Sequence, residues 1–293
     1  MQWKNSAGQA LPEPSSDIGR EHHTIMRNWL KRLCAREKER LHAGWAGRLR
    51  ASGIHLGISL GIAALAALLV FGLWYPYPYR DVSGGRTLFL LVVSVDVIMG
   101  PLITLAIFNR TKRRRELVLD LSVVGMLQLA ALGYGLWTVF VARPVHLVFE
   151  YSRMSVVHAI DVDDQLLAKA PPALQKLPIT GPTLIALRPF KDANEQYDAT
   201  MAALDGAALP ARCDLWQPYA SSTADILAVA KPITDLRQRF AQQTARIDRA
   251  VADSGQPAAQ LRYLPLIDRG TAWTMLLDAA TAEPRGFLAL DPF

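Results

Sequence analysis

Three apolar stretches, each of about twenty residues, dominate the first half of this chain and constrain its fold more than any other feature. They occupy residues 54–74, 87–108 and 117–141. A helix of about 20 apolar residues crosses the ~30 Å hydrocarbon core of a bilayer, and soluble core helices seldom reach that length with so few charges. The connections at 75–86 and 109–116 leave no room for other elements. The sequence therefore predicts a membrane protein, with a tail at 1–50, a three-helix transmembrane anchor at 51–143 and a separate domain at 144–293.

Basic residues around the apolar stretches set the predicted orientation. The loop at 109–116 reads NRTKRRRE and the tail is also basic, whereas the loop at 75–86 has only Arg80 and Arg86, with Asp81 beside them. Short loops rich in Lys and Arg stay cytoplasmic. We therefore expect a bacterial inner-membrane protein with a cytoplasmic N-terminus and a periplasmic C-terminal domain. Aromatic rings, which favour the membrane–water interface, cluster at the predicted outer ends of the spans: Trp74, Tyr75, Tyr77, Tyr79 and Trp137.

The tail divides into two parts. Residues 1–25 are polar and contain Pro12, Pro14, Ser15 and Ser16, a composition typical of disorder. Residues 27–49 intersperse Trp and Leu with Lys and Arg, which is typical of a basic helix on the inner membrane surface. Met26 stands between the two parts, so translation from Met1 and from Met26 are both open alternatives.

The distribution of charge argues against nucleic-acid binding. The chain carries a net charge of +6, with a pI near 9.4. Residues 144–293, however, hold 14 Lys and Arg against 17 Asp and Glu, a net charge of −3, so the remaining +9 lies in the tail and around the spans. Basic residues there serve topology and contact with anionic lipid headgroups. We therefore expect membrane lipids, and no nucleic acid, among the partners.

Motifs of catalysis and metal binding are missing from the sequence. It contains no nucleophile elbow, no phosphate-binding glycine loop and no zinc-ligand spacing. Cys34 and Cys213 fall on opposite sides of the membrane in the predicted topology, so they do not pair within one chain. Cys213 either forms an intermolecular disulfide or, the favoured alternative, is a small buried core residue. The sequence predicts a protein that is not an enzyme and uses no cofactor or metal.

The C-terminal domain has the pattern of an α+β fold. Alternation at 144–162, with a polar break at Ser152 and Arg153, predicts a β-hairpin. A buried strand is expected at 183–187, a helix at 192–205 and a longer amphipathic helix at 231–252, which either binds a partner or, as we favour, packs on its own sheet. Three strands are expected at 261–267, 272–277 and 286–290. This order predicts a mainly antiparallel sheet.

Asp96 is the most informative polar residue within the predicted spans. It lies near the middle of the second span and is followed by Gly100 and Pro101, which should loosen or kink that helix. A carboxyl group at that depth is expected to be neutral or paired. Two alternatives remain open: an internal hydrogen bond to Ser94, Thr104 or Gln128 that fixes the bundle, and a contact with a helix of another protein.

Small residues line one side of the first span. Gly53, Gly57 and Gly61 recur every four residues, a spacing that permits close approach of a second helix. Packing within the bundle and packing against a partner explain this stripe equally well.

Several segments resemble type IV pilin accessory proteins of the TfpX/TfpZ type. The resemblance covers most of residues 53–293, and its most distinctive part is the YPYP run with the glycines that follow it. It rests on GIHLGISL at 53–60, LWYPYPYR at 73–80 with glycines at 84 and 85, Asp96 with Gly100-Pro101-Leu102, Arg115-Glu116-Leu117, QLAALGYGL at 128–136, ARPVHLVFE at 142–150, and WTMLLDAATAEPRGFLALDPF at 273–293.

The resemblance implies an inner-membrane, chaperone-like helper, encoded beside a major pilin and needed for that type IV pilin to be assembled on the surface. No catalytic residues come with the family. The candidate contact residues, in the bundle or with the pilin, are Asp96, Gly100, Pro101, Gly53, Gly57, Gly61, Trp74, Tyr75 and Tyr77. Two other functions compete with this one: a membrane enzyme that modifies pilin, and a sensor with an extracytoplasmic domain. Genomic context separates them, since an adjacent pilin gene favours the helper.

Overall fold

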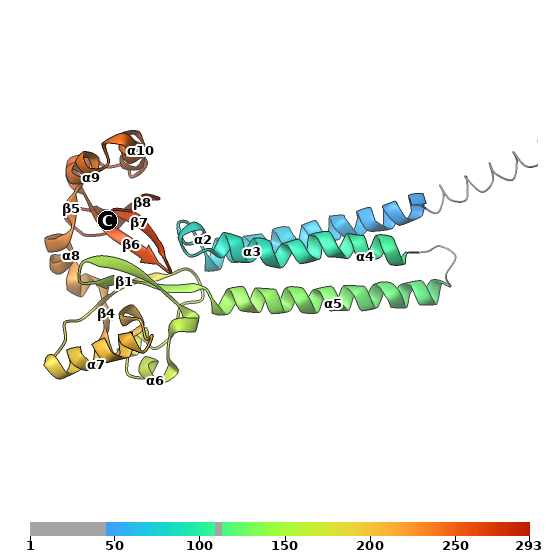
Figure 1. The fold of residues 1–293 in the computed structure, drawn as a ribbon, viewed down its shortest axis with the longest axis horizontal. Coiled ribbons are helices and arrows are strands. Elements are labelled where there is room, and N and C mark those ends of the chain that lie inside the picture. Colours follow the sequence, from blue (N-terminus) through green and yellow to red (C-terminus); the bar gives the residue numbers. More distant parts are fainter. Residues whose placement is uncertain (1–44, 109–112) are drawn as a thin grey trace, which may run out of the picture.

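The computed structural model describes residues 45–108 and 113–293. It shows three long helices that run side by side, with a domain of sheet and short helices at one end of them (Figure 1). Predictions that concern Met1, Met26, Cys34 and the rest of the tail before residue 45, or the loop at 109–112, lie outside the described residues.

The three helices are long and apolar enough to cross a membrane, as the sequence predicted, and we call them the candidate spans. They comprise Trp45–Trp74, Gly85–Ile107 and Arg114–Val141. The first is already helical at Trp45, the first described residue, nine positions before the apolar stretch predicted from the sequence. It ends in a π-helical turn, η1 (Val70–Trp74). The third span is one continuous helix, α5 (Arg114–Val141).

The second span changes its helical geometry where a kink was expected. It consists of α3 (Gly85–Ser94), the π-helical turn η2 (Val95–Met99) and α4 (Gly100–Ile107). Pro101 lacks the N–H that an α-helix uses at this point, and the wider turn before it accommodates that loss. Asp96 lies within this irregular turn.

The loop between the first two spans belongs to the C-terminal domain. Its short helix α2 (Tyr79–Val82) places Tyr79 and Val82 in the same buried cluster as Leu147 and Met275. The Thr271 hydroxyl donates a hydrogen bond to the Val82 carbonyl at 2.9 Å. The interpretation of the tyrosines as interfacial rings is therefore wrong for Tyr79, which is 7% exposed.

The sheet of the C-terminal domain is mixed, which corrects the prediction of a mainly antiparallel one. Its strands follow the order β4-β3-β1-β2-β6-β7-β8, and β5 pairs with β6. Their bounds are β1 (Pro144–Glu150), β2 (Arg153–His158), β3 (Thr183–Leu187), β4 (Trp216–Pro218), β5 (Lys231–Pro232), β6 (Leu261–Asp268), β7 (Thr271–Asp278) and β8 (Pro284–Leu288).

Two parallel pairs at the centre of the sheet account for the difference. The predicted hairpin is present as β1 and β2, but β3 joins it parallel to β1 and β6 joins it parallel to β2. The first long crossover, 159–182, carries the chain from the end of β2 past β1, so β3 runs antiparallel to β2 and parallel to β1. The second, 219–260, contains β5 and carries the chain from β4 to β6, which runs parallel to β2. The strands expected at 183–187, 261–267, 272–277 and 286–290 are present as β3, β6, β7 and β8, with small shifts at their ends.

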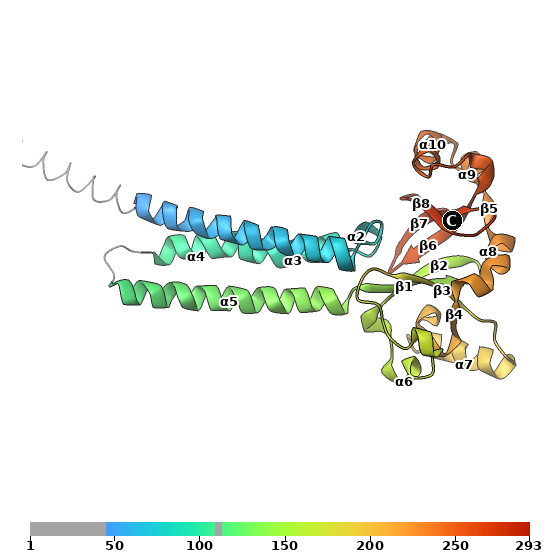
Figure 2. The same ribbon diagram turned by 180° about the vertical axis from the view of Figure 1, so that it is seen from behind.

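Short helices pack around the sheet. They are α6 (Asp164–Leu167), α7 (Ala193–Leu204), α8 (Thr223–Val229), α9 (Ile233–Arg239) and α10 (Thr244–Asp253). Short 3-10 turns lie between them: η3 (Ala159–Asp161), η4 (Pro172–Leu174), η5 (Leu209–Ala211), η6 (Cys213–Leu215), η7 (Tyr219–Ser222), η8 (Ala241–Gln243) and η9 (Ala258–Gln260). Figures 1 and 2 place α10 beside β8 and α6 and α7 toward β4.

Two helix predictions have different outcomes. The helix expected at 192–205 is confirmed as α7, and the Asp192 carboxylate caps it by accepting a hydrogen bond from the Glu195 N–H at 2.8 Å. The prediction of a single helix at 231–252 is wrong. The segment breaks at Phe240 into α9 and α10, because the turn lets apolar residues of both helices pack in one cluster with Tyr263 of β6. That packing on the domain's own sheet is the alternative that we favoured.

The buried state predicted for Cys213 is confirmed. Its side chain lies in the cluster that contains Trp216 and Ile185, with no exposed surface. Burial raises the pKa of the thiol to about 12, so it is protonated and unreactive at neutral pH.

Candidate functional site

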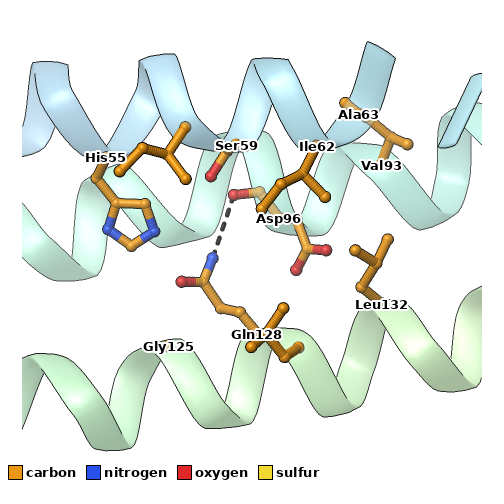
Figure 3. Close-up of a pocket in the computed structure, with 11 residues that line it drawn as sticks. His55, Ser59, Ile62, Ala63, Val93, Asp96, Gly125, Gln128 and Leu132 are labelled. Carbon is orange, nitrogen blue, oxygen red and sulfur yellow. Dashed lines mark hydrogen bonds between the residues drawn. The ribbon is translucent and has the colours of Figure 1, made fainter. Parts of the chain in front are cut away.

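A cavity of about 180 Å³ lies between the three candidate spans (Figure 3). Four of its lining residues are polar: His55 and Ser59 on the first span, Asp96 on the second and Gln128 on the third. The rest of the lining is Ile58, Ile62, Ala63, Val93, Gly125, Leu129 and Leu132. A small cavity that combines an apolar wall with a few polar groups can accept a side chain or a small ligand.

One oxygen of the Asp96 carboxyl group has no hydrogen-bond partner among the described residues. This atom, Oδ1, is buried. The Ser94 hydroxyl donates to the Leu91 carbonyl, and the Thr104 hydroxyl pairs with His55. Gln128 donates its side-chain N–H to the backbone carbonyl of Asp96 at 3.3 Å, not to its carboxyl group (Figure 3). None of the three internal partners considered from the sequence therefore satisfies the carboxyl group.

Gly100 and Pro101 join the second span to its neighbours beside this cavity. Gly100 is buried, and a Cβ added there would overlap the Gln128 amide and lie 3.0 Å from the His55 ring. The absence of a side chain at Gly100 is thus what admits Gln128 and His55. The Pro101 carbonyl accepts a hydrogen bond from the Ser52 hydroxyl at 2.9 Å.

The glycine stripe of the first span faces away from the other two spans. Gly53, Gly57 and Gly61 are exposed, and a Cβ added at any of them would meet no atom within 4 Å. The stripe therefore takes no part in packing among the described residues. Its surface is open to lipid or to another helix.

The three aromatic residues singled out from the sequence have three different surroundings. The Trp74 ring packs against Phe140 of α5, with ring centroids 5.0 Å apart. Tyr75 is fully buried, which corrects its interpretation as an interfacial ring, and its hydroxyl donates to the Val139 carbonyl at 3.1 Å. Tyr77 is 54% exposed, and its hydroxyl donates to the Phe287 carbonyl of β8 at 3.4 Å. These residues join the spans to one another and to the C-terminal domain.

A buried polar cluster in the C-terminal domain escaped the sequence analysis. His158 is 1% exposed and lies between Asp161, 3.4 Å away, and Asp268, 3.3 Å away. Burial lowers the pKa of His158, but the two carboxylates outweigh it and raise the pKa overall. Asp268 is 110 positions from His158, so no local pattern connects them. Within residues 45–108 and 113–293, no group of three or more His, Cys, Asp or Glu is arranged to hold a metal ion.

His146 on β1 should make the domain sensitive to acid. Its ring packs edge-on against Trp216, its Nδ1 pairs with the Thr183 hydroxyl at 2.8 Å, and its Nε2 is buried without a partner in the described part of the chain. Burial lowers its pKa from 6.5 to about 4. Protonation therefore favours the unfolded chain, and stability falls as the pH drops from 6.5 toward 4.

We expect His146 alone to remove about 2 kcal/mol from the unfolding free energy between pH ~7 and pH ~5. Denaturant unfolding of the full chain in detergent, followed by tryptophan fluorescence, measures this loss. His146→Gln keeps a donor for Thr183 but does not titrate, so its acid-induced loss should be smaller by that amount. His158→Gln is the control of opposite sign, because a raised pKa stabilises the folded state at low pH. An unchanged pH dependence in His146→Gln would contradict the assignment.

Comparison with known proteins gives a consistent result. The family described as fimbrial assembly protein FimB matches residues 43–84. The fimbrial assembly protein of serogroup I from Dichelobacter nodosus is 36% identical over 232 residues, which cover 78% of this chain and 89% of that protein. The serogroup E1 protein of the same organism is 34% identical with the same coverage. The protein of serogroups C1 and C2 is 41% identical over 111 residues, 38% of this chain and 85% of its own length. No solved structure matches the chain.

Proposed function

The chain belongs to the fimbrial assembly protein family, and on that premise we propose that it is an inner-membrane accessory protein that assists assembly and surface display of a type IV pilin. It acts as a chaperone-like helper that binds the pilin through both its spans and its C-terminal domain. The observation that carries this proposal is the Oδ1 atom of Asp96, which is buried and makes no hydrogen bond to the described residues around the cavity between the candidate spans. We propose a binding role and no enzymatic one.

The surface of the candidate spans supports a membrane location. Most of their large apolar side chains are exposed in the isolated chain, among them Leu65, Leu68 and Leu127. Water is a poor solvent for such a surface, whereas lipid or another apolar helix covers it at no cost. Arg113, Arg114 and Arg115 stand at the start of α5, at the opposite end from the sheet (Figure 1). By the positive-inside rule that end is cytoplasmic and the sheet periplasmic.

The junction between the spans and the sheet supports joint action of the two parts. The Gly181 N–H donates to the Leu73 carbonyl at 2.6 Å, and Tyr79 is buried in the core of the domain. A partner with one helix in the membrane and a head outside it can therefore meet two surfaces that are held in a fixed relation. A pilin that waits in the inner membrane has this shape.

The names of the relatives support the idea that each accessory protein serves its own pilin. The names of the Dichelobacter nodosus fimbrial assembly proteins each carry a serogroup: I, E1, or C1 and C2. We propose by extension that this chain serves one particular pilin. A membrane enzyme that modifies pilin and an extracytoplasmic sensor remain the competing functions.

Deletion of the gene tests the proposed function directly. We expect surface fimbriae to be lost or strongly reduced, while the pilin remains detectable in the membrane fraction by immunoblotting. Expression of the full chain from a plasmid should restore the fimbriae. Unchanged surface fimbriation in the deletion strain would refute the accessory role. A shift in the mass of the pilin would favour the modifying enzyme instead.

A further inference from the structure

A second cavity, of about 530 Å³, lies in the C-terminal domain between α10 and β8. Residues of α10, with Ser254 just after it, form one wall, and residues 284–289 form the other. Tyr77, three residues after the first candidate span, lies at its rim. We call this cavity the β8 groove. It is separate from the cavity between the spans.

The wall formed by β8 is an open edge of the sheet. β8 is the last strand in the sheet order and pairs with β7 on one side only. The Phe287 carbonyl accepts a long, 3.4 Å hydrogen bond from the Tyr77 hydroxyl, so the backbone of Phe287 faces away from β7. Both polar groups of a strand residue point to the same side. The groove thus presents backbone groups that can pair with an added strand.

The charge of the groove specifies an acidic occupant. Three exposed arginines line it, Arg246, Arg249 and Arg285, against one carboxylate, Asp253. Among the described residues, Arg249 has no hydrogen bond or ion pair, and Arg246 bonds only the neutral Gln243 side chain and the Ala289 carbonyl. The Arg285 guanidinium group already forms ion pairs with Asp278 and Glu283. The guanidinium groups of Arg246 and Arg249 therefore have no carboxylate partner in the described part of the chain.

We propose that the β8 groove binds an extended, acidic peptide segment, which adds a strand beside β8 and pairs its carboxylates with Arg246 and Arg249. Backbone pairing supplies affinity in this mode of binding, and the side-chain contacts supply specificity. Because Tyr77 lies only three residues after a candidate span, the groove lies close to the periplasmic face of the inner membrane. This position fits a partner anchored in the same membrane. If the proposed function holds, on which this step rests, the bound segment belongs to the periplasmic head of the pilin.

Site-specific photocrosslinking in cells tests this inference. Benzoylphenylalanine at Ala289, at the end of the groove wall, should form an adduct that antibodies against the pilin detect. The same probe at the exposed Lys176, between η4 and β3, should form none. In the probe strain, Arg249→Glu should reduce the adduct about tenfold. Arg249 is exposed and makes no hydrogen bond or ion pair among the described residues, so this variant should keep the domain folded.

Three other outcomes would overturn the inference, and they can be told apart from a failure of the proposed function. A matched control, Lys169→Glu with Lys176→Glu, changes exposed charge away from the groove and should leave the adduct unchanged. If the control lost as much adduct as Arg249→Glu, adduct formation would depend on the overall charge of the domain and not on the groove, and the inference would fail. If the probe at Ala289 formed adducts with lipid alone, the arginines of the groove would bind anionic lipid headgroups and not a peptide. Pilin adducts from a probe at Gly57 but not at Ala289 would refute the groove while keeping the accessory function.

Discussion

Replacing Asp96 with leucine should leave the protein in the membrane at its normal level, yet reduce surface fimbriation about tenfold. Leucine removes the cost of about 2.5–3.5 kcal/mol that a charged carboxylate carries at the centre of a span, so insertion does not suffer. The buried Oδ1 of Asp96 has no partner in the described chain. A hydrogen bond between helices in a membrane contributes about 1–2 kcal/mol, which sets the size of the expected effect.

Two control substitutions separate the explanations. Asp96→Asn keeps the size and hydrogen-bonding capacity of the side chain, and we expect near-normal fimbriation. Ser94→Leu, on the same span, should also be tolerated, because the Ser94 hydroxyl bonds only its own helix at Leu91. Surface pilin is measured by immunoassay on intact cells, and the level of the protein by immunoblotting of membranes.

The possible results assign the role of Asp96. Normal fimbriation in Asp96→Leu at normal protein level would make the residue a structural passenger, and the contact within the membrane would be abandoned. If Asp96→Asn is as damaging as Asp96→Leu, the ionised form itself matters. A proton-linked or ion-linked role would then replace simple contact between helices.

Local patterns predicted those parts of the fold that depend on neighbouring residues. The candidate spans follow from long runs of apolar residues, β1 and β2 from alternation, β3 from a short apolar run, and α7 from apolar residues three or four positions apart. Pairing between distant segments has no such pattern. The parallel contacts of β1 with β3 and of β2 with β6 depend on where the crossovers return the chain, which periodicity does not encode.

The candidate site shows the same limit at the level of single residues. A polar residue inside an apolar stretch is visible in the sequence, so Asp96 and Gln128 were both noted. Which atoms meet was not predictable, because the distance between Gln128 and the Asp96 carbonyl depends on the irregular turn η2 and on Gly100. Tyr75 and Tyr79 were misread for a related reason. Their positions at the end of a span suit lipid headgroups, and only the tertiary structure buries them in protein.

Replacing Tyr79 with alanine should destabilise the C-terminal domain by about 3–5 kcal/mol, the range for removing a large buried aromatic ring. Tyr79 lies in the main core cluster, and its ring is 6.3 Å from that of Phe287. Denaturant unfolding of the full chain in detergent, followed by near-ultraviolet circular dichroism, measures the loss. Tyr77→Ala, two residues away and largely exposed, is the matched control and should change the unfolding free energy by less than about 1 kcal/mol.

The same pair of variants separates stability from binding. Tyr79 holds the loop between the spans in the domain, so its loss should lower the level of the protein and, with it, fimbriation. Tyr77 lies at the rim of the β8 groove, so Tyr77→Ala should act on the pilin adduct at normal protein level. A loss of stability in Tyr79→Ala as small as that in Tyr77→Ala would mean that the loop is not part of the core. The spans and the C-terminal domain would then move as separate bodies, and a partner could not rely on a fixed distance between the two surfaces that it meets.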